Sequence, residues 1–297
     1  MARTTASVAL PARHALGEGP AWSERHQALF LVDIPARQVI RWRPGEPARR
    51  WTMPEPVSAA IPRSAGGLLV TLASQVALLD LDDDPDAARP ATLARPDPDP
   101  GNRANEARCD AAGRLWLGTM QNNIAPDGGH VPITASTGGL FRIDPDGTTS
   151  RHAAGVGIAN TLCWSPDGRT LYFADTMRDR IDAYPFDADA GTLGPPAPFA
   201  LGGPGSPDGS AIDDDGFLWT ARWGGACLLR YAPDGRVDRT VALPATQPTS
   251  CAFAGPGSRT LFVTTARHGL ENPCDADGAV LAVDTGIDGP PCREFAG

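Results

Sequence analysis

The sequence has 297 residues and a formal net charge of −9, and all 26 of its basic residues are arginine because lysine is absent. This absence excludes a Schiff-base lysine, a pyridoxal phosphate anchor and the lysine of a phosphate-binding loop. The acidic residues are 28 Asp and 7 Glu, and together with 33 Gly and 30 Pro they favour turns over helices. The composition therefore predicts many turns and little helix.

The charge distribution and the N-terminus bear on partners and location. No basic stripe is present, so neither nucleic acid nor an anionic membrane is expected as a partner, and no pattern identifies a protein partner. The N-terminal segment lacks the apolar centre of a signal peptide, and no 18-residue apolar run occurs, which favours a cytoplasmic protein. The six cysteines contain no C-x-x-C pattern and are expected to be reduced thiols.

A turn cluster followed by a short apolar run recurs along the chain. The runs span residues 28–32, 68–72, 115–118, 171–174, 217–220 and 261–264. Each is too short for a core helix and is typical of a strand. Corresponding leucines lie 39 to 56 residues apart, which is the spacing of one four-stranded sheet per repeat.

A second phrase, an alternating strand that ends in a turn, follows each run. In GGLFRIDPDG the proline presets the first turn position and the glycine supplies a positive φ. Six copies of each phrase predict an all-β fold, a six-bladed β-propeller, as a single domain over residues 1–297. We expect the N-terminal strand Ser7–Leu10 to complete the last blade. A pair of β-sandwiches is the alternative, but the linker that it needs near the middle of the chain is missing.

Two segments depart from the repeat, Arg95–Asn105 and Gln121–Gly138. Irregular loops on a rigid scaffold commonly carry function. Because these segments flank the third apolar run, we expect them to lie near each other, with the second covering a pocket mouth as a lid. The alternative for the first segment is a proline-stiffened connection.

Standard catalytic motifs do not account for the sequence. G-x-S-x-G, H-E-x-x-H, G-x-G-x-x-G and the EF-hand loop are absent. The five histidines never occur as a metal-spaced pair, so we expect neither a catalytic triad nor a histidine-rich zinc site, and most histidines should lie at the surface.

What remains is a set of polar residues that precede apolar strands by similar offsets. They are Glu18 in LGEGPAW, Arg103 and Asn105 in NRANEARC, Asn160 in GIANTLCW and Asp208 in GSPDGSAI. The innermost strands of a propeller converge on its central channel, so these side chains are expected to meet there. Plainer alternatives are that Asp208 is a turn residue, that Asn160 caps a turn and that Arg103 is a solvated charge.

Several phrases together resemble a known family. LGEGPAW, PVSAAIPRSAGG, NRANEARCDAAGRLWLGTM, GIANTLCWSPDGRTLYFADT and PDGSAIDDDGFLW are similar, in order and spacing, to those of the regucalcin, gluconolactonase and luciferin-regenerating protein family. The likeness runs from about Ala15 to Thr285. It implies a six-bladed propeller that holds one divalent metal in its central channel and hydrolyses a sugar lactone, such as gluconolactone or xylonolactone, to the aldonic acid.

Carried over to this sequence, the resemblance implies metal ligation by Glu18, Asn160 and Asp208, with Asp208 also catalytic as the group that moves the proton. Arg103 and Asn105 would bind substrate. Such an oxygen set suits Ca2+, Mg2+ or Mn2+ and tolerates Zn2+ or Fe2+. Animal regucalcins have a glutamate shortly after GTM, where this chain has the substrate-binding candidate Asn123. We expect this change to alter the sugar preference.

Two other functions remain open. Related propellers are metal-dependent phosphotriesterases or arylesterases, and a non-catalytic calcium-binding propeller would use its faces for partners. The converging polar residues disfavour the non-catalytic reading. Among 35 acidic residues, we expect Glu18 and Asp208 to matter for function and the other 33 to lie mainly at the surface and in turns.

Overall fold

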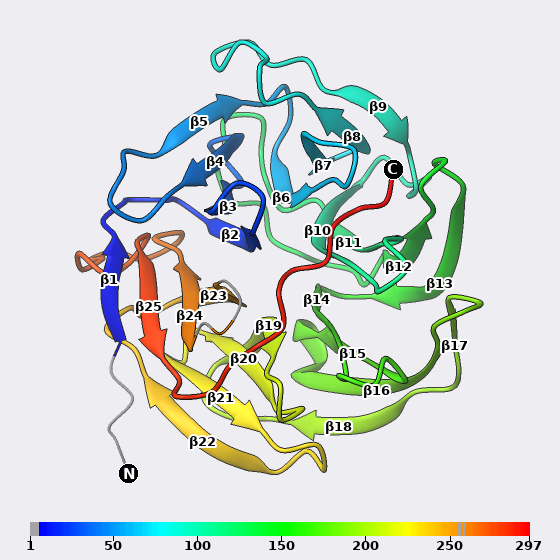
Figure 1. Cartoon of the computed structure of the whole chain (residues 1–297), viewed down its shortest axis with the longest axis vertical. Coiled ribbons are helices and arrows are strands. Elements are labelled where there is room, and N and C mark those ends of the chain that lie inside the picture. The colour runs from blue at the N-terminus through cyan, green and yellow to red at the C-terminus, as the bar shows by residue number, and fades with distance from the viewer. Residues whose placement is uncertain (1–5, 255–256, 258) are drawn as a thin grey trace.

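The computed structural model describes residues 6–254, 257 and 259–297, which form β-strands and one short 3-10 helix. The expected turn at residues 255–260 lies partly outside this range, as do the first five residues of the N-terminal segment. The strands form six antiparallel sheets around a central axis (Figure 1). The six-bladed propeller is therefore confirmed, and the sandwich alternative is wrong. Within the described range, no helix is long and apolar enough to cross a membrane.

The first three blades are four-stranded sheets in chain order, with the innermost strand first. Blade 1 contains β2 (Gly17–Ser23), β3 (Ala28–Asp33), β4 (Gln38–Trp42) and β5 (Arg49–Thr52). Blade 2 contains β6 (Val57–Pro62), β7 (Leu68–Leu72), β8 (Gln75–Leu79) and β9 (Ala91–Ala94). Blade 3 contains β10 (Asn102–Cys109), β11 (Leu115–Gln121), β12 (Gly138–Ile143) and β13 (Thr149–Val156).

The other three blades repeat this order with local additions. Blade 4 contains β14 (Ala159–Trp164), β15 (Thr170–Asp175), helix η1 (Thr176–Arg178), β16 (Arg180–Asp187), β17 (Thr192–Leu193) and β18 (Ala197–Leu201). Blade 5 contains β19 (Ser206–Ile212), β20 (Leu218–Trp223), β21 (Cys227–Tyr231) and β22 (Val237–Ala242). Blade 6 contains β23 (Pro248–Phe253), β24 (Thr260–Thr265), β25 (Val280–Asp284) and β1 (Ala6–Leu10).

Strand β1 closes the ring, as the sequence predicted. It pairs antiparallel with β25, from Ala6 opposite Val283 to Leu10 opposite Val280. The last blade is thus completed by the first strand of the described chain, which leaves no unpaired edge on β25.

The apolar runs form the second strand of each blade, and most of their residues are buried. Strands packed between two neighbouring blades are covered on both faces, so a continuous apolar run is favoured over strict alternation. Buried turn acids help to fix these strands. The indole nitrogen of Trp116 donates to Asp110 at 3.0 Å, and that of Trp219 donates to Asp213 at 2.8 Å. Asp110 and Asp213 are buried, so they are exceptions to the expectation that acidic residues other than Glu18 and Asp208 lie mainly at the surface and in turns.

Two further expectations can be compared with the fold. All six cysteines are free, and four of them are buried, as expected. Four of the five histidines are exposed or partly exposed, in line with the prediction that most lie at the surface, and His14 is buried. Burial lowers the pKa of His14 below its ordinary value, so a neutral ring is favoured there.

Candidate active site

Four of the site candidates on innermost strands lie at or within a β-bulge. The register shifts at Glu18/Ala21 in β2, Ala104/Ala107 in β10, Asn160/Cys163 in β14 and Pro207/Ser210 in β19. A bulge adds one residue to one strand and changes the direction of its side chains. Because the bulges occur early in equivalent strands, they bring Glu18, Asn105, Asn160 and Asp208 to the same end of the central channel.

The backbone around Glu18 explains one of its flanking glycines. Gly19 has a φ of +55°, and a Cβ at this position would lie 2.8 Å from the carbonyl oxygen of Ser58. A side chain is thus excluded by both conformation and space. The backbone N–H of Gly19 donates to Oε2 of Glu18 at 2.8 Å, which orients the carboxylate.

A chain of hydrogen bonds joins the candidates of blades 3 and 4 and continues to the backbone of blade 5. Nη1 of Arg103 donates to Oδ1 of Asn105 at 2.7 Å, and Nδ2 of Asn105 donates to Oδ1 of Asn160 at 3.3 Å. Nδ2 of Asn160 donates to the hydroxyl of Thr176 at 2.8 Å, and that hydroxyl donates to the carbonyl oxygen of Pro207 at 2.7 Å. Asn105 therefore positions Arg103 and Asn160, and Asn160 acts within a strand and not as a turn cap.

Arg103 is 3% exposed, so the solvated-charge alternative is wrong. Its Nε donates to Oδ1 of Asn123 at 2.8 Å, and Nη1 also donates to the carbonyl oxygen of Ala104 at 2.8 Å. Nη2 has no hydrogen-bond partner among the residues that the structure describes, which leaves it available to a ligand. Burial lowers the pKa of Arg103 to about 10, while Glu18 and Asp208 act in the opposite direction, so the guanidinium stays charged at neutral pH.

The two carboxylates Glu18 and Asp208 share the channel end. Burial raises the pKa of Glu18 to about 8, and the negative charge of Glu106 adds to this shift. Burial and the charge of Glu18 hold the pKa of Asp208 well above its ordinary value. Asp208 is 6% exposed and lies inside β19, so the turn-residue alternative is wrong.

This donor set fits a divalent cation. Two buried carboxylates that repel each other are stabilised when a cation is placed between them. Thr176 and Asn105 fix the amide of Asn160, whose Oδ1 adds a third hard oxygen. No three Asp, Glu, His or Cys side chains gather as a metal-binding group in the described part of the chain. A cation at this site would therefore need the amide oxygen as well as both carboxylates.

The segment at 121–138 extends from blade 3 towards blades 1 and 6. Nη2 of Arg37 donates to the carbonyl oxygen of Pro126 at 3.2 Å. His130 contacts His268 of the loop after β24, with 3.3 Å between their ring nitrogens. The expected neighbourhood of the two irregular segments is confirmed by the 2.8 Å bond from the N–H of Asn122 to the carbonyl oxygen of Gly101.

Sequence reasoning missed several residues here. Glu106 is 5% exposed, lies between Asn105 and Ala107 and raises the pKa of both Glu18 and Asp208. Glu106 could have been selected from the sequence, since it is one of only seven glutamates and stands in the same phrase as Arg103. Thr176 and the pair His130 and His268 carry no local pattern, because their partners lie far away in sequence.

The chain is similar to several known proteins. Residues 16–267 match the family model described as SMP-30/Gluconolactonase/LRE-like region. The L-arabinolactonase of Azospirillum brasilense is 35% identical over 98% of this chain and 96% of its own length. Regucalcin of Oryctolagus cuniculus is 33% identical over 97% of both chains. The crystal structure of regucalcin from Agrobacterium tumefaciens, described as a calcium-binding protein, matches with a TM-score of 0.89 and 27% identity, covering 99% of this chain and 98% of that chain.

Proposed function

The chain belongs to the SMP-30/gluconolactonase/LRE-like family, and we propose that it is a divalent-metal-dependent sugar lactonase that opens an aldonolactone to its aldonic acid. The observation that carries this proposal is the placement of two buried carboxylates, Glu18 and Asp208, beside the hydrogen-bonded set Arg103, Asn105 and Asn160. The relative named L-arabinolactonase and the gluconolactonases in the family name support a reaction on sugar lactones.

Glu18, Asn160 and Asp208 would hold the cation, which when bound would act as a Lewis acid on the lactone carbonyl and lower the pKa of water. Calcium, magnesium, manganese, zinc and ferrous iron are all compatible with these ligands. Asp208 accepts the proton of the water whose oxygen attacks the carbonyl carbon. It returns this proton to the ring oxygen as the bond between that oxygen and the carbonyl carbon breaks, which yields the hydroxy acid.

The remaining residues bind and orient the substrate. Nη2 of Arg103 is directed to the oxyanion that develops on the carbonyl oxygen, or to a sugar hydroxyl, because the other nitrogens of this side chain are already occupied. Asn105 accepts a hydrogen bond from Arg103 and holds it in place. Asn123, in the segment at 121–138, does the same. Asn123 is neutral, so the substrate side of the pocket carries one negative charge less than it would with a glutamate.

The proposed substrate class is an aldonolactone. A pentonolactone such as an arabinonolactone is the first candidate, because one relative carries that activity in its name. Gluconolactone and xylonolactone are the next candidates.

A direct test is acid release in weak buffer with arabinonolactone, gluconolactone, xylonolactone and paraoxon, each with and without a chelator. We expect turnover of at least one lactone, loss of it with chelator and recovery with excess metal. Turnover of paraoxon but no lactone would replace this proposal with the phosphotriesterase alternative.

A non-catalytic calcium-binding role is the second candidate, and the regucalcin described as a calcium-binding protein favours it. Calcium binding in a calorimeter, with no turnover of any lactone on any metal, would select that role. The same protein sample serves both measurements, so the two functions are separated directly.

A further inference from the structure

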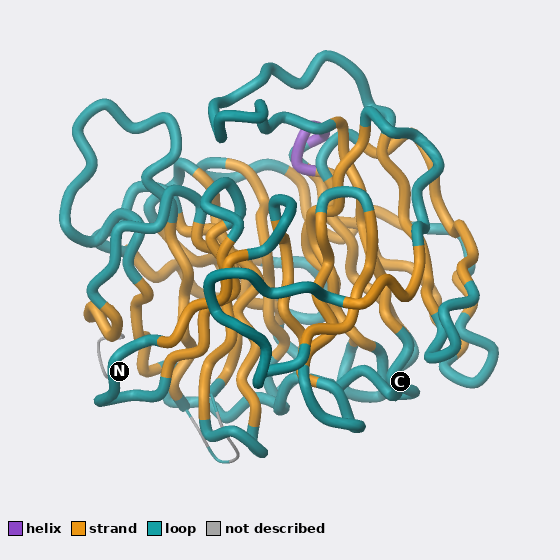
Figure 2. Tube along the Cα trace, turned by 90° about the horizontal axis from the view of Figure 1, so that it is seen from above, coloured by secondary structure: helices purple, strands orange, loops and turns teal. Residues whose placement is uncertain are grey.

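A cavity of about 440 Å³ lies at the other end of the central channel. The blades repeat the same strand order, so the innermost strands run in the same direction and their last residues share one face. The cavity is lined by such late residues, including Arg108 in β10, Trp164 in β14 and Ile212 in β19. Figure 2 shows the helix η1, which contacts the candidate active site, and the C-terminus on opposite rims of the propeller.

The C-terminal segment forms one side of this cavity. It crosses the centre of the propeller (Figure 1) and contributes Pro290, Pro291, Cys292 and Arg293 to the lining. Its course is fixed by hydrogen bonds, since the backbone N–H of Trp22 donates to the sulfur of Cys292 at 3.3 Å and the N–H of Phe295 donates to the carbonyl oxygen of Pro62 at 2.9 Å. The cavity is therefore enclosed by ordered chain on this side.

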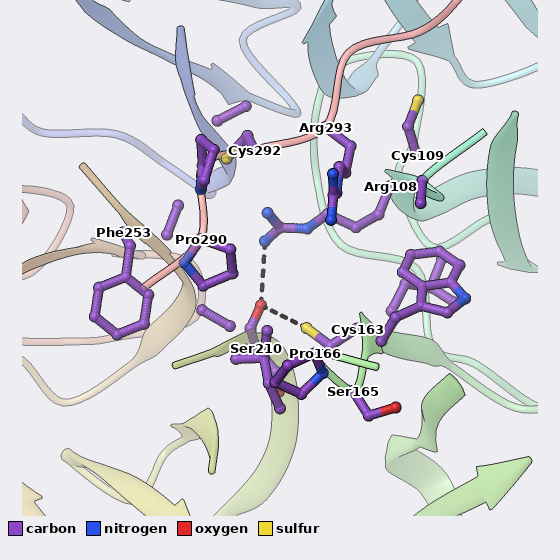
Figure 3. Close-up of a pocket in the computed structure, with 18 of the residues that line it drawn as sticks. Arg108, Cys109, Cys163, Ser165, Pro166, Ser210, Phe253, Pro290, Cys292 and Arg293 are labelled. Atoms are coloured by element: carbon purple, nitrogen blue, oxygen red, sulfur yellow. Dashed lines mark hydrogen bonds between the residues drawn. The ribbon is translucent and has the colours of Figure 1, made fainter. Parts of the chain in front are cut away.

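Arg108 points into the cavity from β10 (Figure 3). Its side chain is 17% exposed, and its ion pair with Glu106 measures 3.4 Å. Its other acceptors lie 3.2 to 3.4 Å away and are the carbonyl oxygens of Pro20, Ser210 and Cys251 and the hydroxyl of Ser250. Charge-assisted hydrogen bonds to carboxylates are usually about 2.7–2.9 Å, so this guanidinium can still form a shorter bond with an anion.

The walls of the cavity are apolar and aromatic. Trp164 and Phe186 line it. Phe253 and Pro290 line it as well (Figure 3). Nε1 of Trp164 is buried and has no hydrogen-bond partner among the described residues. Aromatic walls with few polar groups, at a volume within the roughly 300–1,000 Å³ of small-molecule sites, are suited to a planar apolar ligand.

The mouth of the cavity carries charged side chains of both signs. Arg293 is exposed and has no hydrogen bond or ion pair within the described residues. Two acids, Asp167 and Asp214, also line the rim, and both are exposed. Asp167 is engaged in its own turn, where it accepts hydrogen bonds from the hydroxyl of Ser165 at 2.6 Å and the N–H of Arg169 at 3.1 Å. Inside the cavity, Arg108 is the charged side chain in the lining, and Arg293 is the cation at the mouth.

We propose that this cavity is a second ligand-binding site, which takes a small aromatic carboxylate with its ring between the aromatic walls and its carboxylate on Arg108. Arg293 adds attraction at the mouth. The site includes none of Glu18, Arg103, Asn105, Asn160 and Asp208, so it goes beyond the proposed lactonase function and does not depend on it.

The test is calorimetric titration of the full chain with 2-naphthoate and with its neutral analogue 2-naphthamide at low salt. We expect the carboxylate to bind more tightly than the amide. Ala111 is exposed and lines the cavity, so Ala111→Trp should fill the mouth and weaken naphthoate binding by about tenfold or more, which corresponds to about 1.4 kcal/mol. Ala112→Trp, on the exposed neighbour that does not line the cavity, is the matched control and should bind as the wild type does.

A second pair of variants tests the charge. Arg293→Ala should weaken naphthoate binding by about two- to fivefold, since an exposed charge contributes modestly, and should leave binding of the amide unchanged. Arg151→Ala, on an exposed arginine of β13, is the control. The proposal is overturned if naphthoate does not bind, if the amide binds equally well, or if Ala111→Trp leaves the affinity unchanged. Loss of naphthoate binding in Asp208→Ala would also overturn it, because the ligand would then occupy the candidate active site.

Discussion

The hydroxyl of Thr161 donates a 2.6 Å hydrogen bond to the backbone carbonyl oxygen of Asp208. Thr161 directly follows Asn160, is fully buried and has a φ of +50°, a conformation that β-branched residues rarely adopt. The same hydroxyl lies 2.8 Å from that of Ser210. Blades 4 and 5 are therefore tied together at the two bulges that carry Asn160 and Asp208, and this contact supports the unusual backbone.

Replacing Thr161 by valine keeps its shape and removes this hydrogen bond. We expect a loss of about 1–3 kcal/mol in the free energy of unfolding, because the buried carbonyl of Asp208 loses its donor. The kcat/KM for the best lactone should also fall. Thermal unfolding and lactone turnover measure both effects. Thr192→Val, at an exposed position of β17, is the control, and equal stability and activity of the two variants would contradict this role of Thr161.

Asp208→Ala should reduce turnover by at least about 100-fold, since it removes the group that moves the proton. The circular dichroism spectrum should remain that of the wild type. Asp234→Ala is the matched control, because Asp234 stands in a similar Pro-Asp-Gly phrase but lies exposed in a turn. Equal activity of the two variants would show that Asp208 has no catalytic role.

The raised pKa of Glu18 predicts how the metal-free protein responds to pH. Its pKa is about 8 in the folded chain, compared with 4.5 ordinarily, so the folded state holds the proton more tightly. The stability from this group is fully present below pH 4.5 and is lost as the pH rises through 8. In chelator, we expect the Tm to fall between pH 5 and pH 8.

Glu18→Gln removes this titrating group and its charge. Its Tm in chelator should fall less steeply between pH 5 and pH 8 than that of the wild type. Metal affinity, measured by calorimetry at pH 8, should fall by about tenfold or more, because one of two charged ligands is lost. Full metal affinity in this variant would mean that Glu18 is not a ligand.

Asn123→Glu should change the sugar preference more than it changes metal affinity. Nε of Arg103 already donates to Asn123, and a glutamate would accept the same bond while adding a negative charge to the substrate side. We expect the ratio of kcat/KM between a pentonolactone and gluconolactone to change by about fivefold or more, corresponding to about 1 kcal/mol. An unchanged substrate profile would remove Asn123 from the specificity determinants.

His130→Ala should raise the KM for the lactone a few-fold with little effect on kcat. The contact between His130 and His268 ties the segment at 121–138 to blade 6, and neither ring touches the proposed proton path. Its loss should weaken closure over the channel and not the chemical step. His152→Ala, on the outer strand β13, is the control. If KM stays unchanged, the segment does not act as a lid.

Much of the fold could be predicted because it depends on residues that are close together in the sequence. The apolar runs, the turn clusters and their spacing are properties of neighbouring residues, and each run became the second strand of a blade. The site was harder to predict. Asp208 in Pro-Asp-Gly has the same local pattern as Asp234, so a turn role stayed open for it in the sequence, and its position inside β19 became clear only from the structure.

The sequence by itself determined the number of blades, the closing strand and the candidates Glu18, Arg103, Asn105, Asn160 and Asp208. The tertiary structure decided how these residues meet, since the bulges, the burial that raises the pKa of Glu18 and the contacts of Thr161 and Thr176 all depend on residues that are distant in the chain. The physical reason is that turn and strand preferences are set by near neighbours. Side-chain direction, desolvation and charge repulsion are set by the neighbouring blades.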